Sequence, residues 1–323
     1  MQQVDMQIAA IARTLPNCII VSSDSDLLAI PGAILSWVLV QNFALMTWAL
    51  GIGSVAILAY LFFVGFTQMT KVERERIFLA LVLIAASVVF WTLFEQAGSS
   101  LNQFAERNTD LRITPNQTMQ AAQTQSFNAG FILLLAPAFS ALWAWLGRRT
   151  LDPNPMIKFG LALLQVGAGF FVLVWGAKFA DANFQVPLIF LVIAYLLHTT
   201  GELCLSPVGL SQMTKLSTAA VVSTVMATWF LASSWAQQIG ALVAQMTAAE
   251  TVAGQVLDPG KALATYAHVF LLIGYWGVGA GVVMLALSPF LSKWAHGASD
   301  VGPAEQEVVA VDAAGPSPDP AAP

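Results

Sequence analysis

Long apolar stretches separated by short polar segments constrain this chain more than any other feature. The first runs from about residue 27 to 66, and six more lie near 77–104, 119–146, 158–179, 186–213, 219–247 and 264–292. Runs of about 20 or more apolar residues let a helix cross a bilayer, whereas a membrane barrel shows alternating segments of about 10 residues. The sequence therefore predicts an all-α integral membrane protein.

Composition excludes the main alternatives. Only 10% of the 323 residues are charged, against about 25% in a typical soluble domain. This is too little charge to cover the surface of a soluble enzyme or to keep a chain disordered. The net charge of −5 also gives no basic surface for a nucleic acid. We therefore expect neither an enzyme nor a nucleic-acid-binding protein.

The cysteines and histidines give no sign of a metal or a cofactor. Cys18 and Cys204 are isolated in different contexts, and His198, His268 and His296 have no ligand spacing. The sequence thus predicts no disulfide framework, no metal site and no cofactor.

The polar segments divide the chain into four parts. Residues 1–26 are weakly polar and lack the pattern of a signal peptide. Residues 27–68 form an apolar stretch that is too long for one straight span, so it is either a helical hairpin or a short helix leading into a spanning one. Residues 69–297 hold six further segments, which predicts a six-helix bundle. Residues 298–323 are rich in Pro, Ala and acidic residues, which predicts a disordered tail.

The distribution of Lys and Arg predicts an orientation. Alternate loops divide the cations into eight and four. The larger set consists of Lys71, Arg74, Arg76, Arg148, Arg149, Lys158, Lys215 and Lys293, and the smaller of Arg107, Arg112, Lys178 and Lys261. By the positive-inside rule, the larger set faces the cytoplasm.

Polar residues recur at helical spacing on four of the six helices, while the third and sixth helices are plain. The four stripes are Trp91, Glu95, Ser99 and Asn102; Gln117, Gln120, Thr124 and Asn128; His198, Glu202 and Ser206; and Trp229, Ser233 and Gln237. Side chains three or four residues apart share one face of a helix.

The two acids carry more information than the other polar residues. A lone Ser, Thr or Gln often only bonds a neighbouring helix, and a tryptophan can simply pack. Glu95 and Glu202, however, must be neutralised, paired or hydrated inside a bilayer, which indicates a water-filled cavity. Pro137 and Pro207 are the positions where we expect a break or a kink.

The order of the stripes indicates a known membrane architecture. In each triplet of consecutive helices, the first two carry a polar stripe and the third does not. We therefore expect four helices to line a polar path and two to face lipid. This pattern matches one half of a major facilitator fold, a six-helix unit built from two three-helix repeats. A second half is needed to close the central cavity.

Two stretches resemble the proton-dependent oligopeptide transporter family (POT/PTR). They are Phe90 to Asn108, FWTLFEQAGSSLNQFAERN, and Gly201 to Ser211, GELCLSPVGLS. The resemblance extends from about residue 43 to 295 and covers the family's carboxy-terminal half with the hairpin that precedes it. The Glu-x-x-Glu-Arg-Phe stretch of the family's first half does not occur in this sequence.

The resemblance implies roles for single residues. Glu95 matches the proton-accepting glutamate of the seventh family helix, and Trp91 matches a pocket tryptophan. Asn128 matches a peptide-binding asparagine, although Ala129 follows it where the family usually has proline. Glu202 matches the acid that receives the peptide's amino terminus. The pocket-lining positions of the eleventh helix correspond to Trp229 and Ser233.

The resemblance implies proton-coupled symport of di- and tripeptides across the inner (cytoplasmic) membrane. The ammonium of a zwitterionic peptide needs a carboxylate such as Glu202, and its carboxylate needs a cation, which we expect on a separate amino-terminal half. The expected partners are peptides, protons, the lipid bilayer and that half. A non-transporting six-helix remnant or interaction subunit stays open as an alternative, as does another facilitator substrate.

Overall fold

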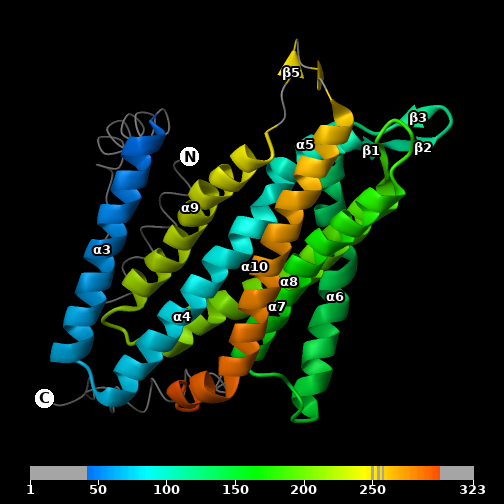
Figure 1. Cartoon of the computed structure of the whole chain (residues 1–323). Coiled ribbons are helices and arrows are strands. Elements are labelled where there is room, and N and C mark those ends of the chain that lie inside the picture. The colour runs from blue at the N-terminus through cyan, green and yellow to red at the C-terminus, as the bar shows by residue number, and fades with distance from the viewer. Residues whose placement is uncertain (1–41, 249–250, 253–254, 257, 299–323) are drawn as a thin grey trace, which may run out of the picture. The chain divides into compact units, whose positions relative to one another are not determined.

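The computed structural model describes residues 42–248, 251–252, 255–256 and 258–298. The predictions made for residues 1–26, for the first part of segment 27–68 and for the tail beyond Ala298 lie outside these residues. Figure 1 shows that long helices dominate the rest of the chain.

The six predicted helices of the bundle are present. They are α4 (Lys71–Phe94), which continues through η1 (Glu95–Gly98) into α5 (Ser100–Asn108), then α6 (Ser126–Arg148), α7 (Pro155–Gly176), α8 (Leu188–Leu216), α9 (Val222–Met246) and α10 (Pro259–Trp294). Helix α3 (Phe43–Thr67) precedes them, and η2 (Ala121–Gln125) and η3 (Ala177–Phe179) are short 3-10 turns. The strands β1 (Thr109–Asp110), β2 (Arg112–Thr114), β3 (Gln117–Thr118), β4 (Val186–Pro187), β5 (Thr251–Val252) and β6 (Gln255–Val256) all lie in connections.

Capping residues in the local sequence determine where several helices begin. Before α4, the Thr70 hydroxyl accepts from the Glu73 backbone N–H and the Glu73 carboxylate accepts from the Thr70 N–H, which is a capping box. Asn154 caps α7 and Asp258 caps α10, each followed by proline at the first helical position. A proline is favourable there because its missing N–H has no intrahelical acceptor in the first turn.

Glycines bring α7 and α10 into close contact. A Cβ on Gly167 would lie 2.6 Å from the Val278 nitrogen and 2.9 Å from the Gly274 oxygen, and one on Gly277 would lie 2.8 Å from Gly167 Cα. Small residues at such crossings let membrane helices pack backbone to backbone. Helix α7 is therefore not peripheral, although it carries no polar stripe: 13 of its 22 residues are buried.

The outer helix faces fit a membrane. Leu133 and Leu134 of α6 are 78% and 73% exposed, Trp276 of α10 is 69% exposed, and no residue of α6 is buried. Among the described residues, six segments are long and apolar enough to cross a membrane: α3, the stretch from α4 through α5, the stretch from η2 through α6, the stretch from α7 through η3, α8 and α10. Helix α9, predicted as a span, has 25 residues but is more polar and is not one of these six.

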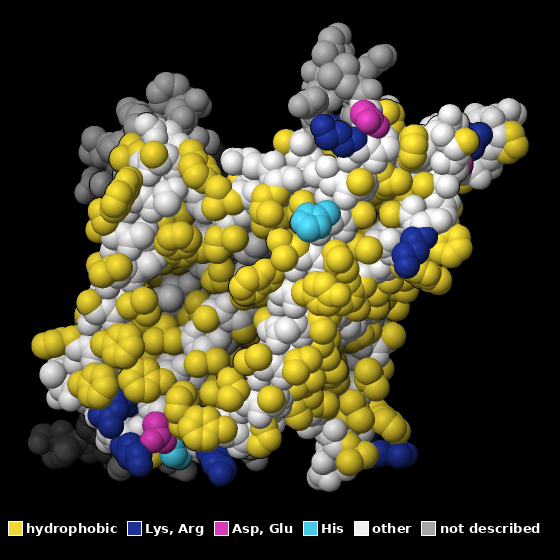
Figure 2. Space-filling model, in the orientation of Figure 1, with side chains coloured by type: hydrophobic (Ala, Val, Ile, Leu, Met, Phe, Trp, Pro, Cys, Tyr) yellow, Lys and Arg dark blue, Asp and Glu magenta, His cyan; other side chains and the backbone are white. Residues whose placement is uncertain are grey.

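The larger set of cations gathers at one end of the bundle. Arg76, near the start of α4, donates to the Ala295 and His296 carbonyls after α10, and His296 Nε2 lies 2.6 Å from Glu75 Oε2. Figure 2 shows hydrophobic side chains over the middle of the visible helices and Lys and Arg near their ends. Which end faces the cytoplasm stays a prediction.

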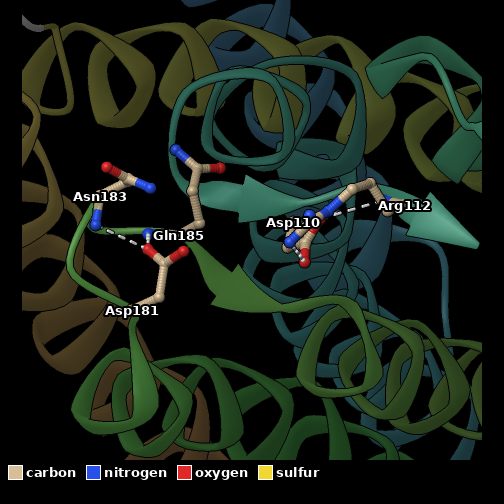
Figure 3. A network of polar contacts seen from close by, with 5 residues as sticks. All are labelled: Asp110, Arg112, Asp181, Asn183 and Gln185. Carbon is tan, nitrogen blue, oxygen red and sulfur yellow. Dashed lines mark hydrogen bonds and ion pairs between the residues drawn. The ribbon is translucent and has the colours of Figure 1, made fainter. Parts of the chain in front are cut away.

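The opposite end is tied together by polar contacts between connections (Figure 3). Asp181 Oδ1 accepts from the Asn183 and Gln185 backbone nitrogens, and the Gln185 side chain donates to the Arg107 carbonyl at 3.0 Å. Beside it, Arg112 forms two 2.8 Å bonds with Asp110. These bonds lower the pKa of Asp110 to about 2.

Candidate functional site

Glu95 lies at a break between two helices. Helix α4 ends at Phe94, the 3-10 turn η1 begins at Glu95, and Ser99, with φ −127° and ψ −96°, separates it from α5. The predicted stripe of Trp91, Glu95, Ser99 and Asn102 is therefore interrupted at this point, although Lys71–Asn108 is still one candidate membrane span. By contrast, α6 runs through Pro137 and α8 runs through Pro207.

The break has a tertiary cause that the sequence does not display. Gln96 is fully buried, and its amide donates to the Thr92 carbonyl and, at 3.2 Å, to the Gly240 carbonyl of α9. The hydroxyl of Ser100 donates to Gln96 Oε1 at 2.7 Å. These bonds to one buried side chain hold the local backbone out of α-helical register. Because of the change in register, Ser99 and Asn102 do not continue the face of Trp91 and Glu95.

The second predicted stripe is also shorter than expected. Gln117 lies in strand β3, Gln120 precedes η2, and Thr124 lies within η2, so only Asn128 is on helix α6. Gln120 and Gln123 form the capping box of η2. These glutamines had helical spacing in the sequence, but they serve the turn that leads into the helix.

Glu95 and Asn128 line one cavity. Its volume is about 170 Å³, and three stretches of the chain enclose it: the end of α4 with η1, the η2–α6 junction, and α8. The lining residues are Phe94, Glu95, Ala97, Gly98, Gln125, Asn128, Tyr195 and His198. The structure thus joins polar residues that are far apart in the sequence.

Asn128 connects this cavity to Glu202. Its side-chain nitrogen donates to Glu202 Oε2 at 3.0 Å and to Thr199 Oγ1 at 3.1 Å. The Thr199 hydroxyl in turn donates to the Tyr195 carbonyl one turn earlier on α8. Asn128 lines the same cavity as Glu95. The two predicted acids and the predicted amide therefore form one polar cluster.

Trp91 stands beside the cavity without lining it. Its indole is half-buried and packs edge-on against Phe94, with ring centroids 5.2 Å apart, and against Phe90 at 5.4 Å. Phe94 itself lines the cavity. Trp91 therefore supports the aromatic wall in this structure, and its predicted contact with a substrate stays a prediction.

Trp229 and Ser233 of α9 lie away from this cavity. Trp229 is 7% exposed and packs edge-on against Phe159 of α7, and its indole fills the space that Gly209 leaves on α8. Ser233, one turn later, is exposed. Neither residue lines the cavity of Glu95, so their assignment to the substrate site stays a prediction.

Several residues of the cluster were not predicted. His198 was placed on the stripe of Glu202 without a role, and Thr199, Tyr195 and Gln125 were not singled out. Thr199 and Tyr195 are three and seven residues before Glu202, on the same helix face. That spacing was the signal that could have found them.

Among the described residues, no group of His, Cys, Asp or Glu side chains is arranged to hold a metal ion. The cavity can offer the carboxylate of Glu95, the side-chain amides of Gln125 and Asn128 and the imidazole of His198 to a ligand. This set of acceptors suits a group that donates several N–H bonds.

Comparison with known proteins identifies one family. The sequence pattern of the POT family matches residues 33–261. Dipeptide and tripeptide permease A of Edwardsiella piscicida is 33% identical over 265 residues, which are 82% of this chain and 52% of that protein. The peptide transporter YePEPT of Yersinia enterocolitica is 37% identical over 179 residues, 55% of this chain and 35% of its own length.

Solved structures give the same result. The crystal structure of a peptide transporter POT in complex with sulfate aligns with a TM-score of 0.65 at 30% identity, covering 84% of this chain and 53% of that one. A variant of a peptide transporter POT in complex with alafosfalin aligns with a TM-score of 0.66 at 30% identity, covering 84% and 52%. The chain spans about half the length of the dipeptide and tripeptide permeases it matches.

Proposed function

Because this chain belongs to the POT family, we propose that it supplies the carboxy-terminal half of a symporter that carries di- and tripeptides with protons across the inner membrane. The single observation that supports this best is the cluster of Glu202, Asn128 and Glu95 at one cavity. The whole transporter needs a second six-helix half, which we propose is a separate polypeptide or a further part of a longer one.

Glu202 is the proposed partner of the peptide's ammonium group. Asn128 holds one carboxylate oxygen at 3.0 Å, which fixes the direction of the other. A charge-assisted bond between ammonium and carboxylate is stronger in a partly dry cavity than in water. The relatives named dipeptide and tripeptide permease support a substrate with such a group.

The peptide's carboxylate needs a cation that the described part of this chain does not bring to the cavity. None of the cavity-lining residues is Lys or Arg. The buried Lys158 lies at the basic end of the bundle and is paired with Asp152 at 2.8 Å. We therefore propose that the cation for the substrate carboxylate comes from the other half.

Glu95 is the proposed proton acceptor. It lines the cavity directly, and Asn128 of the same cavity donates to Glu202. Two carboxylates near one another disfavour double ionisation, so arrival of an ammonium and binding of a proton are linked. No catalytic step is part of this proposal.

Reconstitution tests the proposal. Liposomes would hold this chain alone, this chain with the amino-terminal half of the Edwardsiella permease, or the intact permease. The readout is accumulation of labelled dialanine under an inward proton gradient. We expect accumulation by the pair and the permease, and none by the chain alone. Failure of the pair in liposomes where its assembly is verified, with the intact permease active, would contradict the proposal, and accumulation by the chain alone would overturn the half-transporter.

A further inference from the structure

The residues around His198 leave a space that its imidazole ring fills. His198 lies on α8, is 1% exposed and lines the cavity. Its ring centroid is 4.9 Å from that of Phe170 and 6.4 Å from that of Phe94. A Cβ on Gly169 would lie 2.6 Å from both Cδ2 and Nε2 of His198, so the ring fills space that only glycine leaves open.

The contacts of His198 fix its tautomer when the ring is neutral. Nε2 lies 3.1 Å from the Val166 carbonyl of α7. A carbonyl only accepts, so Nε2 carries the hydrogen and Nδ1 is left as a bare acceptor. Within the described residues, Nδ1 is buried and has no hydrogen-bond partner. A buried acceptor without a donor is unfavourable, so a donor that arrives there is stabilised.

The groups around the cavity differ in what they can donate. Asn128 already donates to Thr199 and Glu202. The titratable groups near His198 are Tyr195 and Glu202 on its own helix and Glu95 across the cavity, while α7 approaches it through the Val166 carbonyl and the Phe170 ring. A carboxylate has no hydrogen to donate, and a protonated carboxyl has one.

Glu95 is the acid best placed to reach this acceptor. It follows directly after Phe94, whose ring contacts His198. It also begins the 3-10 turn η1, and a 3-10 turn inside a helical segment often marks a hinge. Gly98, at the end of that turn, has no atom within 4 Å of the position of a Cβ, so that end of the turn is open. Glu202, by comparison, is held by Asn128.

We propose that His198 is a positioning residue that distinguishes the two protonation states of Glu95. Nδ1 accepts a hydrogen bond from protonated Glu95 and gives the carboxylate no donor, so the contact exists only while the proton is bound. The proton stays on Glu95 throughout, and no covalent bond changes. The contact holds η1 against α8 in the protonated state and releases it when the proton leaves. This inference rests on the proposed role of Glu95 in proton coupling.

Infrared spectroscopy tests the contact without transport. The full chain in lipid nanodiscs is compared at acidic and alkaline pH, and the carbonyl stretch of protonated Glu95 is identified by its loss in Glu95→Gln. In His198→Phe, which keeps a flat ring without nitrogens, we expect the band to move to the higher frequency of a more weakly bonded carboxyl. In His198→Gln the band should stay low, because that amide can donate to Val166 and still accept. An unmoved band in a folded His198→Phe chain would overturn the proposal.

The same variants in the two-half complex test the consequence. His198→Phe should raise the proton concentration for half-maximal dialanine accumulation by roughly 3- to 10-fold, the effect of losing one hydrogen bond, while His198→Gln should stay within about twofold. Proton-driven accumulation should fall more in His198→Phe than counterflow without a proton gradient. Equal loss of accumulation and counterflow would mean a packing defect and overturn the proposal. An infrared shift with no transport by the parent complex would instead contradict only the proposed function.

Discussion

Replacing Gly167 by alanine tests the packing that holds α7 against α10. The new methyl group would lie 2.6 Å from the Val278 nitrogen, 2.9 Å from the Gly274 oxygen and 3.0 Å from the Gly277 carbonyl carbon. All three are backbone atoms, which cannot rotate away as a side chain does. The two helices must therefore move apart along a contact that depends on their closeness.

The expected loss of stability follows from two opposing terms. Overpacking a tight contact costs about 1–3 kcal/mol, and alanine gains about 1 kcal/mol over glycine in helix propensity. Since backbone relaxes poorly, we expect Gly167→Ala to lower the free energy of unfolding by about 1–2 kcal/mol. The matched control is Gly279→Ala on α10, where nothing lies within 4 Å of the added atom. That variant should be as stable as the parent or slightly more so.

The assay is reversible unfolding in mixed micelles with increasing dodecyl sulfate, followed by circular dichroism and tryptophan fluorescence. The measured quantity is the difference in unfolding free energy between each variant and the parent. If Gly167→Ala proved as stable as Gly279→Ala, the close approach of α7 and α10 would be wrong, and so would the account of why α7 is buried without a polar stripe.

Three further predictions concern charged groups. In the two-half complex, Glu202→Gln should weaken binding of peptides with a free amino terminus by about 2–5 kcal/mol and affect amino-blocked peptides less; equal losses in a binding titration would refute the assignment. Glu95→Gln should abolish proton-driven accumulation and spare counterflow, so accumulation at the parental level would make Glu95 a structural residue. The Asp110–Arg112 pair should add little to stability, since Arg112 is 65% exposed. The pKa of Asp110 is lowered to about 2, so this contribution to stability is complete above the unfolded pKa of about 3.9. It is lost as the pH falls through 2. In acid titrations, Arg112→Ala and the parent should therefore differ in stability only above about pH 2.

The helices were predictable because a bilayer and helix capping act on local sequence. Apolar length revealed the spans, and Asn154-Pro155 and Asp258-Pro259 mark helix starts that need no tertiary partner. The break at Glu95 could not be found in this way. It depends on the bond from Gln96 to a carbonyl of α9, 144 residues later. A proline is a local signal for a break, yet α6 and α8 run through theirs.

The positions of the two acids in the polar cluster were predictable from the sequence, whereas the positions of the tryptophans were less so. An ionisable carboxyl group inside a membrane span is energetically costly unless its surroundings are polar. For this reason Glu95 and Glu202 could be assigned to one polar cluster from the sequence. A tryptophan is stable either in a pocket or in packing, and its direction depends on its neighbours. Trp229 turns toward Gly209, which leaves room for the indole on α8, and spacing along α9 does not reveal that room.

The charge of the cavity is the physical argument for a partner. Glu95 lines it, Glu202 adjoins it, and among the described lining residues none is cationic. Two ionised acids without counter-charges in a low-dielectric space repel one another and are poorly solvated. They can be stabilised by protons, by an ammonium group or by cations on a second half, and a proton-coupled peptide carrier would use all three in turn. Each of these stabilises a different arrangement of the same two carboxyls, so we expect the preferred state of this half to depend on which one is bound.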